Sequence, residues 1–469
     1  MMIVKTAQGL RARLARGLGG EVVLPDDPRA ISGVVNRLAW PVILENLFQT
    51  LLGVVDMLMV SRLGSEAIAG VGTALQVMFV VNATFAAITV GTTVLVARFT
   101  GAGQPAEANR VAKQSLLLGV VISAVIMLLG HFFAETAVAL LGPEASVVTL
   151  GGGYLRIVSQ MAIFLITMFI AGGALRGAGD TRTPMLVTGF INLVNAGVAY
   201  LLIFGRLGLP ALGVNGSAWG ASIARAVGAA ILLAVLLRGR VKISIVGREG
   251  WGFDLDLVRR ILHLGIPSMF EQLLMSGGML LYSVITISLG TKVYATQRIT
   301  FNALSISFLP GFGFAMAATA LTGQSLGAQR PELAERSTWY AVRMAAVWMS
   351  SMGLLLIVAG APIMRLFSQD PEIVNLGAVA LKVIALSQPL QALAQVLAGG
   401  LRGAGDTRFP MVVIFMGIWL VRLPLGYLMG PVLGYSLPGV YVSNVLDALL
   451  RAGACLLRYR AGRWREIKV

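Results

Sequence analysis

The sequence contains one ten-residue string twice, which divides the chain into two related halves. Residues 175–184 read LRGAGDTRTP and residues 401–410 read LRGAGDTRFP, so nine of ten positions agree at an offset of 226 residues (401 − 175). The same ungapped offset relates further pairs: Pro41 and Pro267, Glu45 and Glu271, Gly101 and Gly327, Pro105 and Pro331, Arg110 and Arg336, and Gly151 and Gly377. A long repeat that keeps its spacing predicts two structural units of the same design.

Composition places both halves in a membrane. Of the 469 residues, 57% are hydrophobic and only 12% are charged, whereas soluble domains are typically ~25% charged. The apolar runs reach the ~20 residues that a spanning helix needs, and they are continuous rather than alternating, which disfavours a β-barrel. We therefore predict an all-α polytopic membrane protein with twelve transmembrane helices in two pseudo-symmetric six-helix lobes. The expected spans are 41–62, 68–96, 114–134, 150–173, 184–205, 212–237, 262–289, 295–322, 340–362, 376–400, 410–430 and 436–457.

The charge distribution predicts the orientation of these spans. Lys and Arg number 37 against 21 Asp and Glu, giving a net charge of +16, and the basic residues gather in alternate loops and at both ends. Basic loops face the cytoplasm, so we expect both termini inside, in the cell (inner) membrane, and no nucleic-acid partner. Lobes of equal orientation are parallel repeats about an axis along the membrane normal. The expected divisions are an N-terminal tail 1–38, an N-lobe 39–237, a cytoplasmic linker 238–260, a C-lobe 261–458 and a C-terminal tail 459–469.

Polar residues on one face of the first span are candidates for function. Glu45, Gln49 and Asp56 lie within about 40° of one another around a helix, and the two carboxylates are about 16 Å apart along its axis. An ionisable group inside a span is costly and indicates function by default. Asp56, surrounded by apolar neighbours, can carry a proton, contribute to a sodium site or pair with a cationic substrate. Glu45 is either part of the same pathway or an interfacial residue near the cytoplasmic mouth.

The second half keeps only part of this pattern. At the offset of 226 residues, Glu271 matches Glu45, but Met275 and Tyr282 stand where Gln49 and Asp56 stood. The lobes are therefore chemically unequal, and we expect the Asp56 lobe to hold the coupling ion. Glu271 is a second protonation site, a substrate contact or a structural residue, and Tyr282 is a further substrate candidate.

The repeated motifs are expected in cytoplasmic turns. Glycine permits tight backbone there, and the Arg and Asp of each motif can pair to fix the turn, so we predict structural or hinge roles. Pro310 removes a hydrogen bond from the eighth span and predicts a bend, as a hinge or a fixed kink. We expect no metal site and no catalytic residues. The turn residues concerned are Arg176, Gly177, Gly179, Asp180, Arg402, Gly403, Gly405 and Asp406.

The chain resembles the multidrug and toxic compound extrusion (MATE) family of prokaryotic type over about residues 35–460. The paired LRGAGDTR motifs, the first-span pattern of Pro41, Gln49 and Asp56, and the Gly-rich turns after the second and eighth spans carry this resemblance. It implies two six-helix lobes around a central cleft and cation-coupled export. It also implies an ion site in the first lobe, where Asp56 matches the family's first-span Asp and Asn195 matches an Asn on the fifth span.

One departure from the family pattern concerns the ion. Ala199 stands where several relatives have a second Asp, so sodium and proton both remain open. Asp56, Gln49 and Asn195 offer one carboxylate and two amide oxygens, and this small ligand set favours a proton.

The sequence thus predicts a secondary active multidrug efflux transporter that works by alternating access. Its substrates are amphipathic, often cationic, organic compounds, its surroundings are the lipid bilayer, and it needs no cofactor besides the coupling ion, H⁺ or Na⁺. We expect a monomer. One alternative is a lipid-linked oligosaccharide or lipid flippase, whose cavity would need several intramembrane Arg or Lys, and we expect few such residues inside the spans. A membrane-embedded enzyme is a further alternative, but no HExxH or Ser–His constellation is present.

Overall fold

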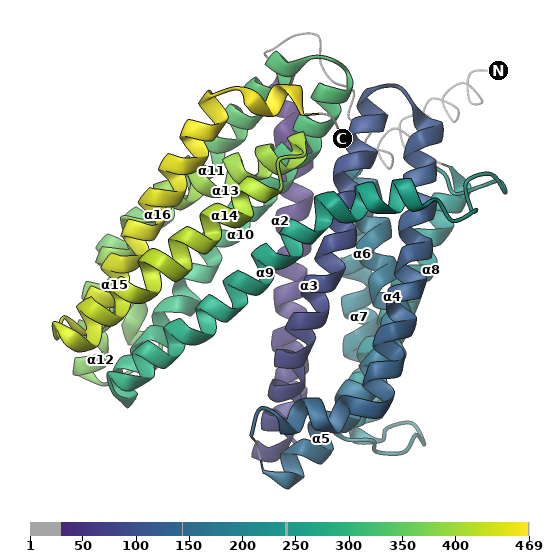
Figure 1. The fold of residues 1–469 in the computed structure, drawn as a ribbon. Helices are drawn as coiled ribbons and strands as arrows, with labels where there is room; N and C mark the ends of the chain where they lie inside the picture. The colour runs from purple at the N-terminus through teal and green to yellow at the C-terminus, as the bar shows by residue number, and fades with distance from the viewer. Residues whose placement is uncertain (1–29, 143, 240–242, 468) are drawn as a thin grey trace, which may run out of the picture. The chain divides into compact units, whose positions relative to one another are not determined.

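The computed structural model describes residues 30–142, 144–239, 243–467 and 469, and helices are the regular secondary structure of this part of the chain (Figure 1). The first half contains α2 (Ile31–Ser61), α3 (Ser65–Gly101), α4 (Pro105–Ala139), α5 (Ala145–Gln160), α6 (Ala162–Gly177), α7 (Arg182–Phe204) and α8 (Val214–Arg238). The second half contains α9 (Leu255–Ser288), α10 (Thr291–Gly327), α11 (Pro331–Arg365), α12 (Pro371–Ala385), α13 (Gln388–Ala404), α14 (Arg408–Ile414), η2 (Phe415–Arg422), α15 (Leu423–Tyr427), η3 (Leu428–Val432), α16 (Ser436–Arg460) and η4 (Arg463–Glu466).

The helices provide the twelve predicted spans. Ten helical segments of the described chain are long and apolar enough to cross a membrane, and two bent helix pairs bring the number to 12. The pairs are α5 with α6, bent by 55°, and α12 with α13, bent by 47°. In the second pair Pro389 cannot donate a hydrogen bond to the carbonyl of Ala385, the residue at which α12 ends. The all-α, twelve-span prediction is confirmed.

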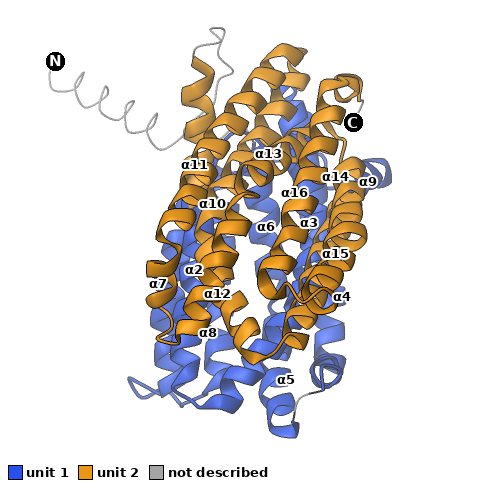
Figure 2. Ribbon diagram, turned by 90° about the vertical axis from the view of Figure 1, so that its left-hand side faces the viewer, with its two compact units in different colours: residues 1–23, 44–266 blue, residues 24–43, 267–469 orange. Residues whose placement is uncertain are grey.

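The chain forms two compact units, shown in Figure 2. In the described part, unit 1 comprises residues 44–266, and unit 2 comprises residues up to 43 together with 267–469. The helices α2 and α9 each change unit along their length, within a few residues of Pro41 and Pro267. The unit boundaries lie about five residues beyond the lobe boundaries expected from the sequence, inside helices rather than in loops.

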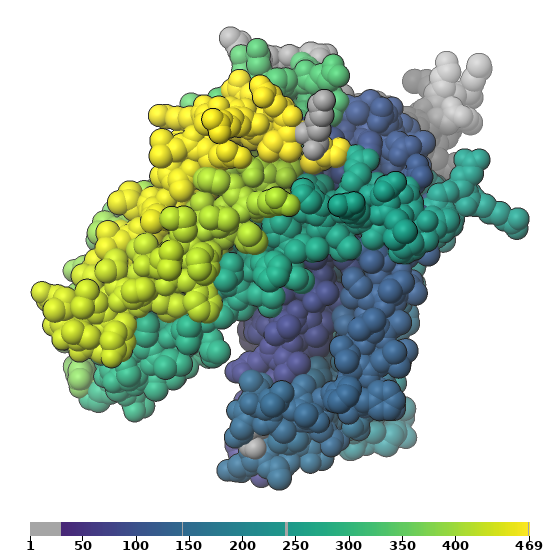
Figure 3. Space-filling model, viewed as in Figure 1, coloured from purple at the N-terminus to yellow at the C-terminus, as the bar shows by residue number. Residues whose placement is uncertain are grey.

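Each unit is built around one long helix. In unit 1, α3 packs against α4, α5 and α6, while α7 packs against α8. In unit 2, α10 packs against α11, α12 and α13, and α16 packs along α14, η2, α15 and η3, which lie beside it on one face of the unit in Figure 3. The equivalent elements make equivalent contacts, as the repeat predicts.

The span formed by residues 408–432 departs from regular α-helix. Its middle section η2 and its end η3 are π-helical. A π-helix has wider turns than an α-helix and is frequently found at functional sites. Arg422, at the end of η2, belongs to the charge network described below.

The polar linker between the halves is bound to the start of α4 within unit 1. Lys113, only 4% exposed, donates its ammonium to three backbone carbonyls of the linker at 2.7–3.1 Å. These acceptors are the carbonyls of Val246, Gly247 and Glu249. Two neighbouring residues of α4 add to the attachment. Gln114 donates to the carbonyls of Gly250 and Gly252 and accepts from the amide of Asp254. Asn109 accepts from the amide of Ser244. Residues 243–254 therefore form an ordered strap on α4.

Candidate functional site

The structure brings together two of the three predicted ion-site residues in unit 1. Asp56 on α2 accepts a hydrogen bond from Asn195 Nδ2 on α7 at 2.7 Å. Asn195 is fully buried, and its side-chain oxygen has no hydrogen-bond partner among the described residues. A buried acceptor beside a carboxylate is suited to an incoming cation or proton donor, because leaving it unpaired costs about 1–3 kcal/mol.

Gln49 does not join this pair. Its side chain is exposed on the surface of unit 1, and no described hydrogen bond connects it to Asp56 or Asn195. It lies seven residues before Asp56, or about 10 Å along the α2 axis. The predicted set of three oxygen ligands is therefore reduced to two in this conformation.

Two residues that the sequence analysis missed also surround Asp56. Arg225 on α8 is close enough to act electrostatically on this carboxylate, and the buried Tyr154 on α5 lies in the neighbourhood of both groups. Arg225 lies inside the apolar helix Val214–Arg238. It could have been found from the sequence as an ionisable residue within a predicted span.

Ala199 faces a neighbouring helix at close range. It is fully buried, and a Cβ atom built on Gly220 of α8 would lie 2.6 Å from the Ala199 Cβ. Small residues on both sides allow α7 and α8 to approach closely, as is typical of membrane helices. The position thus has a packing role that a larger side chain could not fill without moving α8.

The two equivalent glutamates form equivalent ion pairs. Glu45 pairs with Arg176 at 3.0 Å in unit 1, and Glu271 pairs with Arg402 at 2.6 Å in unit 2. Each arginine belongs to an LRGAGDTR motif. The first arginine of each motif therefore does not pair with the aspartate of its own motif: it reaches a glutamate on the first helix of its half.

The motif aspartates have other partners. Asp180 accepts from the backbone amides of Arg182 and Thr183 and thereby caps α7, whose first donors have no helical partner. Asp406 instead accepts from Arg458 at the end of α16. Both aspartates stabilise turns, and Asp406 also ties its turn to a distant helix.

Two glycines of each motif have different physical tasks. A Cβ at Gly177 would lie 2.6 Å from the carbonyl oxygen of Thr93, so α6 and α3 approach closely at this glycine. In the second half, a Cβ at Gly403 would lie 2.2 Å from the carbonyl oxygen of Thr319, so α13 and α10 approach in the same way. Gly179 and Gly405 have φ angles of +94° and +96°, a left-handed conformation that glycine adopts at no steric cost. The motif is thus a close helix contact followed by a tight turn.

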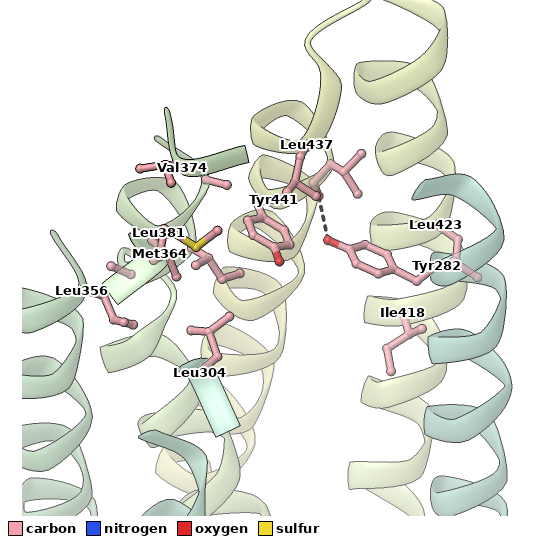
Figure 4. Packing of buried hydrophobic residues seen from close by; sticks show 14 of the residues in the cluster. Tyr282, Leu304, Leu356, Met364, Val374, Leu381, Ile418, Leu423, Leu437 and Tyr441 are labelled. Atoms are coloured by element: carbon pink, nitrogen blue, oxygen red, sulfur yellow. Dashed lines mark hydrogen bonds between the residues drawn. The ribbon is translucent and has the colours of Figure 1, made fainter. Parts of the chain in front are cut away.

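In unit 2, Tyr282 occupies the position that corresponds to Asp56, and it is a buried packing residue with a polar hydroxyl. It is 4% exposed, and its hydroxyl donates to the carbonyl of Val440 at 3.2 Å (Figure 4). It belongs, together with Leu304, Ile418 and Tyr441, to the cluster of buried residues that forms the core of the unit. Pro310 lies within α10, which continues through it from Thr291 to Gly327.

A buried ion network in unit 2 was not predicted. Asp447 on α16 is fully buried and lies between two guanidinium groups, 2.5 Å from Arg422 and 2.8 Å from Arg451. Arg422 also donates to the side-chain oxygen of Asn444 at 3.2 Å. The sequence analysis did not single out Arg422 and Arg451, although both lie within helices that qualify as spans. Their charges are tolerated there because they share a buried carboxylate.

Arg422, Arg451 and Asn444 line a cavity of about 360 Å³ within unit 2. Its wall is mostly apolar and aromatic, with glutamine and asparagine side chains between. Of the predicted substrate residues, Glu271 and Tyr282 both line it. Pockets of this kind, largely apolar with a few polar groups, bind small organic molecules.

Comparison with known proteins places the chain among transporters. A family model named MatE matches residues 41–201 and again residues 267–428. The chain is 30% identical over 440 residues to a probable multidrug resistance protein NorM of Thermotoga maritima, covering 92% of each chain. It is 27% identical over 433 residues to an uncharacterized transporter YisQ of Bacillus subtilis, covering 92% of this chain and 93% of the relative.

Solved structures have the same fold. One is the outward-facing conformation of a multidrug resistance MATE family transporter of the MOP superfamily, with a TM-score of 0.86 and 23% identity, covering 95% of this chain and 98% of that one. Another is a MATE protein in a bent conformation, with a TM-score of 0.85 and 23% identity, covering 95% of this chain and 99% of that one.

Proposed function

The chain belongs to the MatE family, a family of multi-pass membrane transporters rather than enzymes, and we propose that it exports amphipathic organic compounds by cation-coupled antiport. Relatives named as probable multidrug resistance proteins support this substrate class. The observation that carries the coupling proposal is Asp56 in unit 1, a carboxylate inside a span whose hydrogen-bond partner is the neutral amide of Asn195.

The arrangement around Asp56 suggests how the ion is linked to conformational change. Glu45 has its charge balanced by Arg176, whereas Asp56 has an amide donor and the more distant Arg225. When a cation loads Asp56, the attraction between this carboxylate and Arg225 weakens, so the conformation that this attraction favours loses part of its stabilisation. A ligand shifts a conformational equilibrium only through such a difference in interaction. One charge crossing 100 mV supplies about 2.3 kcal/mol for the cycle.

We propose a proton as the coupling ion. A sodium ion prefers several oxygen ligands. This site offers the Asp56 carboxylate and the Asn195 oxygen that has no described partner, whereas Gln49 is exposed and Ala199 is packed against Gly220. A proton needs only one carboxylate.

The proposed function is tested with purified protein in proteoliposomes. Export of a fluorescent cationic dye is measured under a pH gradient, and separately under a sodium gradient at equal pH with an uncoupler present. We expect export under the pH gradient only, and its loss in Asp56→Asn. Asp256→Asn, which removes an exposed carboxylate, serves as the matched control and should retain export. Robust sodium-driven export that depends on Asp56 would overturn the proton assignment, and unchanged export by Asp56→Asn would overturn the coupling site.

We also propose that both termini face the cytoplasm of the inner membrane. Cys455 is buried and is the single cysteine of the chain, so introduced cysteines can be labelled against a low background. A membrane-impermeant maleimide should label Leu207→Cys in intact cells, but Arg248→Cys and Glu332→Cys only after lysis. Labelling of either of the last two from outside would refute this topology.

A flippase for lipid-linked oligosaccharides is the second candidate, favoured by the three arginines that line the unit 2 cavity. The volume of this cavity, about 360 Å³, is small for a lipid-linked oligosaccharide, since pockets for small molecules already span about 300–1,000 Å³. Translocation of a fluorescent pyrophosphate-linked lipid in the same proteoliposomes, without dye export, would favour the flippase.

A further inference from the structure

We propose that the cavity within unit 2 binds an amphipathic organic anion, that is, an apolar ring system with one carboxylate or sulfonate. This inference rests on the proposed export function and specifies the chemistry of a substrate class for one lobe. It differs from the cationic substrates expected from the sequence.

The apolar part of such a ligand has a matching wall. Aromatic side chains from α10 and flexible methionines from α9 line the cavity. Methionine adapts to irregular apolar shapes, and aromatic rings provide large contact areas. These residues are Met275, Met279, Phe301, Phe308 and Phe312.

The charge of the preferred ligand follows from which residues of the buried network line the cavity. The guanidinium-bearing side chains of Arg422 and Arg451 line the cavity and remain 13% and 14% exposed. Asp447, between them, is 0% exposed and does not belong to the lining. The cavity therefore meets two positive groups, with the compensating carboxylate behind them.

Balancing the charges leaves one positive charge in excess. Arg422 and Arg451 share the single carboxylate of Asp447, and Arg402 is balanced by Glu271. An organic cation would find both carboxylates already paired with guanidinium groups. An anion would neutralise the excess charge, which is a strong preference in a site of low dielectric constant.

Donor atoms are also available. The described hydrogen bonds and ion pairs of both arginines use their Nε and Nη2 atoms, so each Nη1 can donate to a ligand. Hydrogen bonds from a guanidinium to a carboxylate are about twice as strong as neutral ones. Glu271 also lines the cavity, and one of its carboxylate oxygens has no hydrogen-bond partner among the described residues.

The network is built into the fold of this unit. A Cβ at Gly417 of η2 would lie 2.1 Å from Asp447 Oδ1, so glycine is required for Asp447 to lie against the π-helical segment. At the offset of 226 residues, Arg225 of unit 1 corresponds to Arg451. The positions of Arg422 and Asp447, however, are occupied in unit 1 by Ala196 and Ala221. The positive cavity is therefore particular to unit 2.

The test uses the full-length protein in lipid nanodiscs and two probes that share one ring system and differ in charge. Fluorescence titrations compare 9-anthracenecarboxylate with (9-anthracenyl)methylammonium. We expect the carboxylate to bind at least tenfold more tightly. Arg451→Gln, which leaves the neutral pair of Arg422 and Asp447, should remove this preference, and Arg451→Lys should retain it.

Controls separate the cavity from general electrostatics and from folding. Arg365→Gln removes an exposed positive charge of unit 2 and should keep the preference for the anion. If Arg451→Gln is not monodisperse, Ala398→Phe, which adds bulk to the cavity wall, should abolish binding of the carboxylate. Equal or tighter binding of the ammonium probe by the wild type, or equal behaviour of the two Arg→Gln variants, would overturn the inference. Asp56-dependent dye export by the same purified protein in proteoliposomes tells whether the proposed function fails as well.

Discussion

Replacing Lys113 by Met should release the linker from α4. Met preserves most of the aliphatic length of the side chain but removes an ammonium that donates to three carbonyls at 2.7, 3.1 and 3.1 Å. A hydrogen bond to a charged group contributes about 1.5–3 kcal/mol. Because the three bonds share one charge, we take about 3 kcal/mol for the whole contact rather than three times that value.

This energy is measured by proteolysis at Arg248, an exposed residue between the bound carbonyls of Gly247 and Glu249. Trypsin cleaves a strap of this kind only after it opens, so the rate follows the opening equilibrium when reclosing is fast. A loss of about 3 kcal/mol corresponds to an increase in cleavage rate of about 100-fold, since about 1.4 kcal/mol is a factor of ten. The appearance of the peptide end at Glu249 is followed by mass spectrometry.

The matched control is Arg110→Gln, which removes a partly exposed ion pair with Asp254 from the same strap. Such a pair contributes about 0–1 kcal/mol, so the cleavage rate should rise by less than about fivefold. A rise of less than threefold in Lys113→Met, or equal rates for both variants, would refute the view that the buried ammonium holds the linker.

Two further predictions concern thermal unfolding of the purified protein. Asp447→Asn should lower the stability of the protein by about 3–5 kcal/mol, because two guanidinium groups lose their buried carboxylate. Adding Arg451→Gln should recover much of this loss. A double variant no more stable than Asp447→Asn alone would contradict the charge balance. Ala199→Asp should destabilise the protein by at least about 1–3 kcal/mol through overpacking against Gly220. Adding sodium should not restore the stability lost in Ala199→Asp. A sodium-dependent rise in melting temperature that is specific to this variant would show that position 199 can complete a cation site.

The fold could be predicted from the sequence because its signals are local and repeated. Apolar runs of span length give the helices directly, and the constant offset gives their division into halves. The contact of Asn195 with Asp56 was accessible only through the family resemblance, since 139 residues separate the two. The pairing of Glu45 with Arg176 carried a signal that was not used: both residues recur at the offset of 226, as Glu271 and Arg402, and the separation of 131 residues is the same in both halves.

The network around Asp447 was missed for two physical reasons. Hydropathy averaged over a span hides a few charged residues among many apolar ones. A local signal was nevertheless present, because Asp447 and Arg451 lie four residues apart, a spacing that brings side chains together on a helix. Arg422 lies at the end of a π-helical segment, where each turn contains more residues than in an α-helix. A projection at 100° per residue therefore assigns Arg422 to the wrong face.

The two units use one scaffold for two electrostatic tasks. In unit 1, Asp56 is held by a neutral amide, so it can gain or lose a cation without breaking an ion pair. In unit 2, neutralising Asp447 would leave Arg422 and Arg451 buried side by side without a counter-ion, at a cost of several kcal/mol. Asp447 is therefore unsuited to a cycle of loading and release, whereas the positive groups it holds in place are suited to recognising an anion. On this argument the ion couples through unit 1, and unit 2 contributes a fixed charge that selects the substrate.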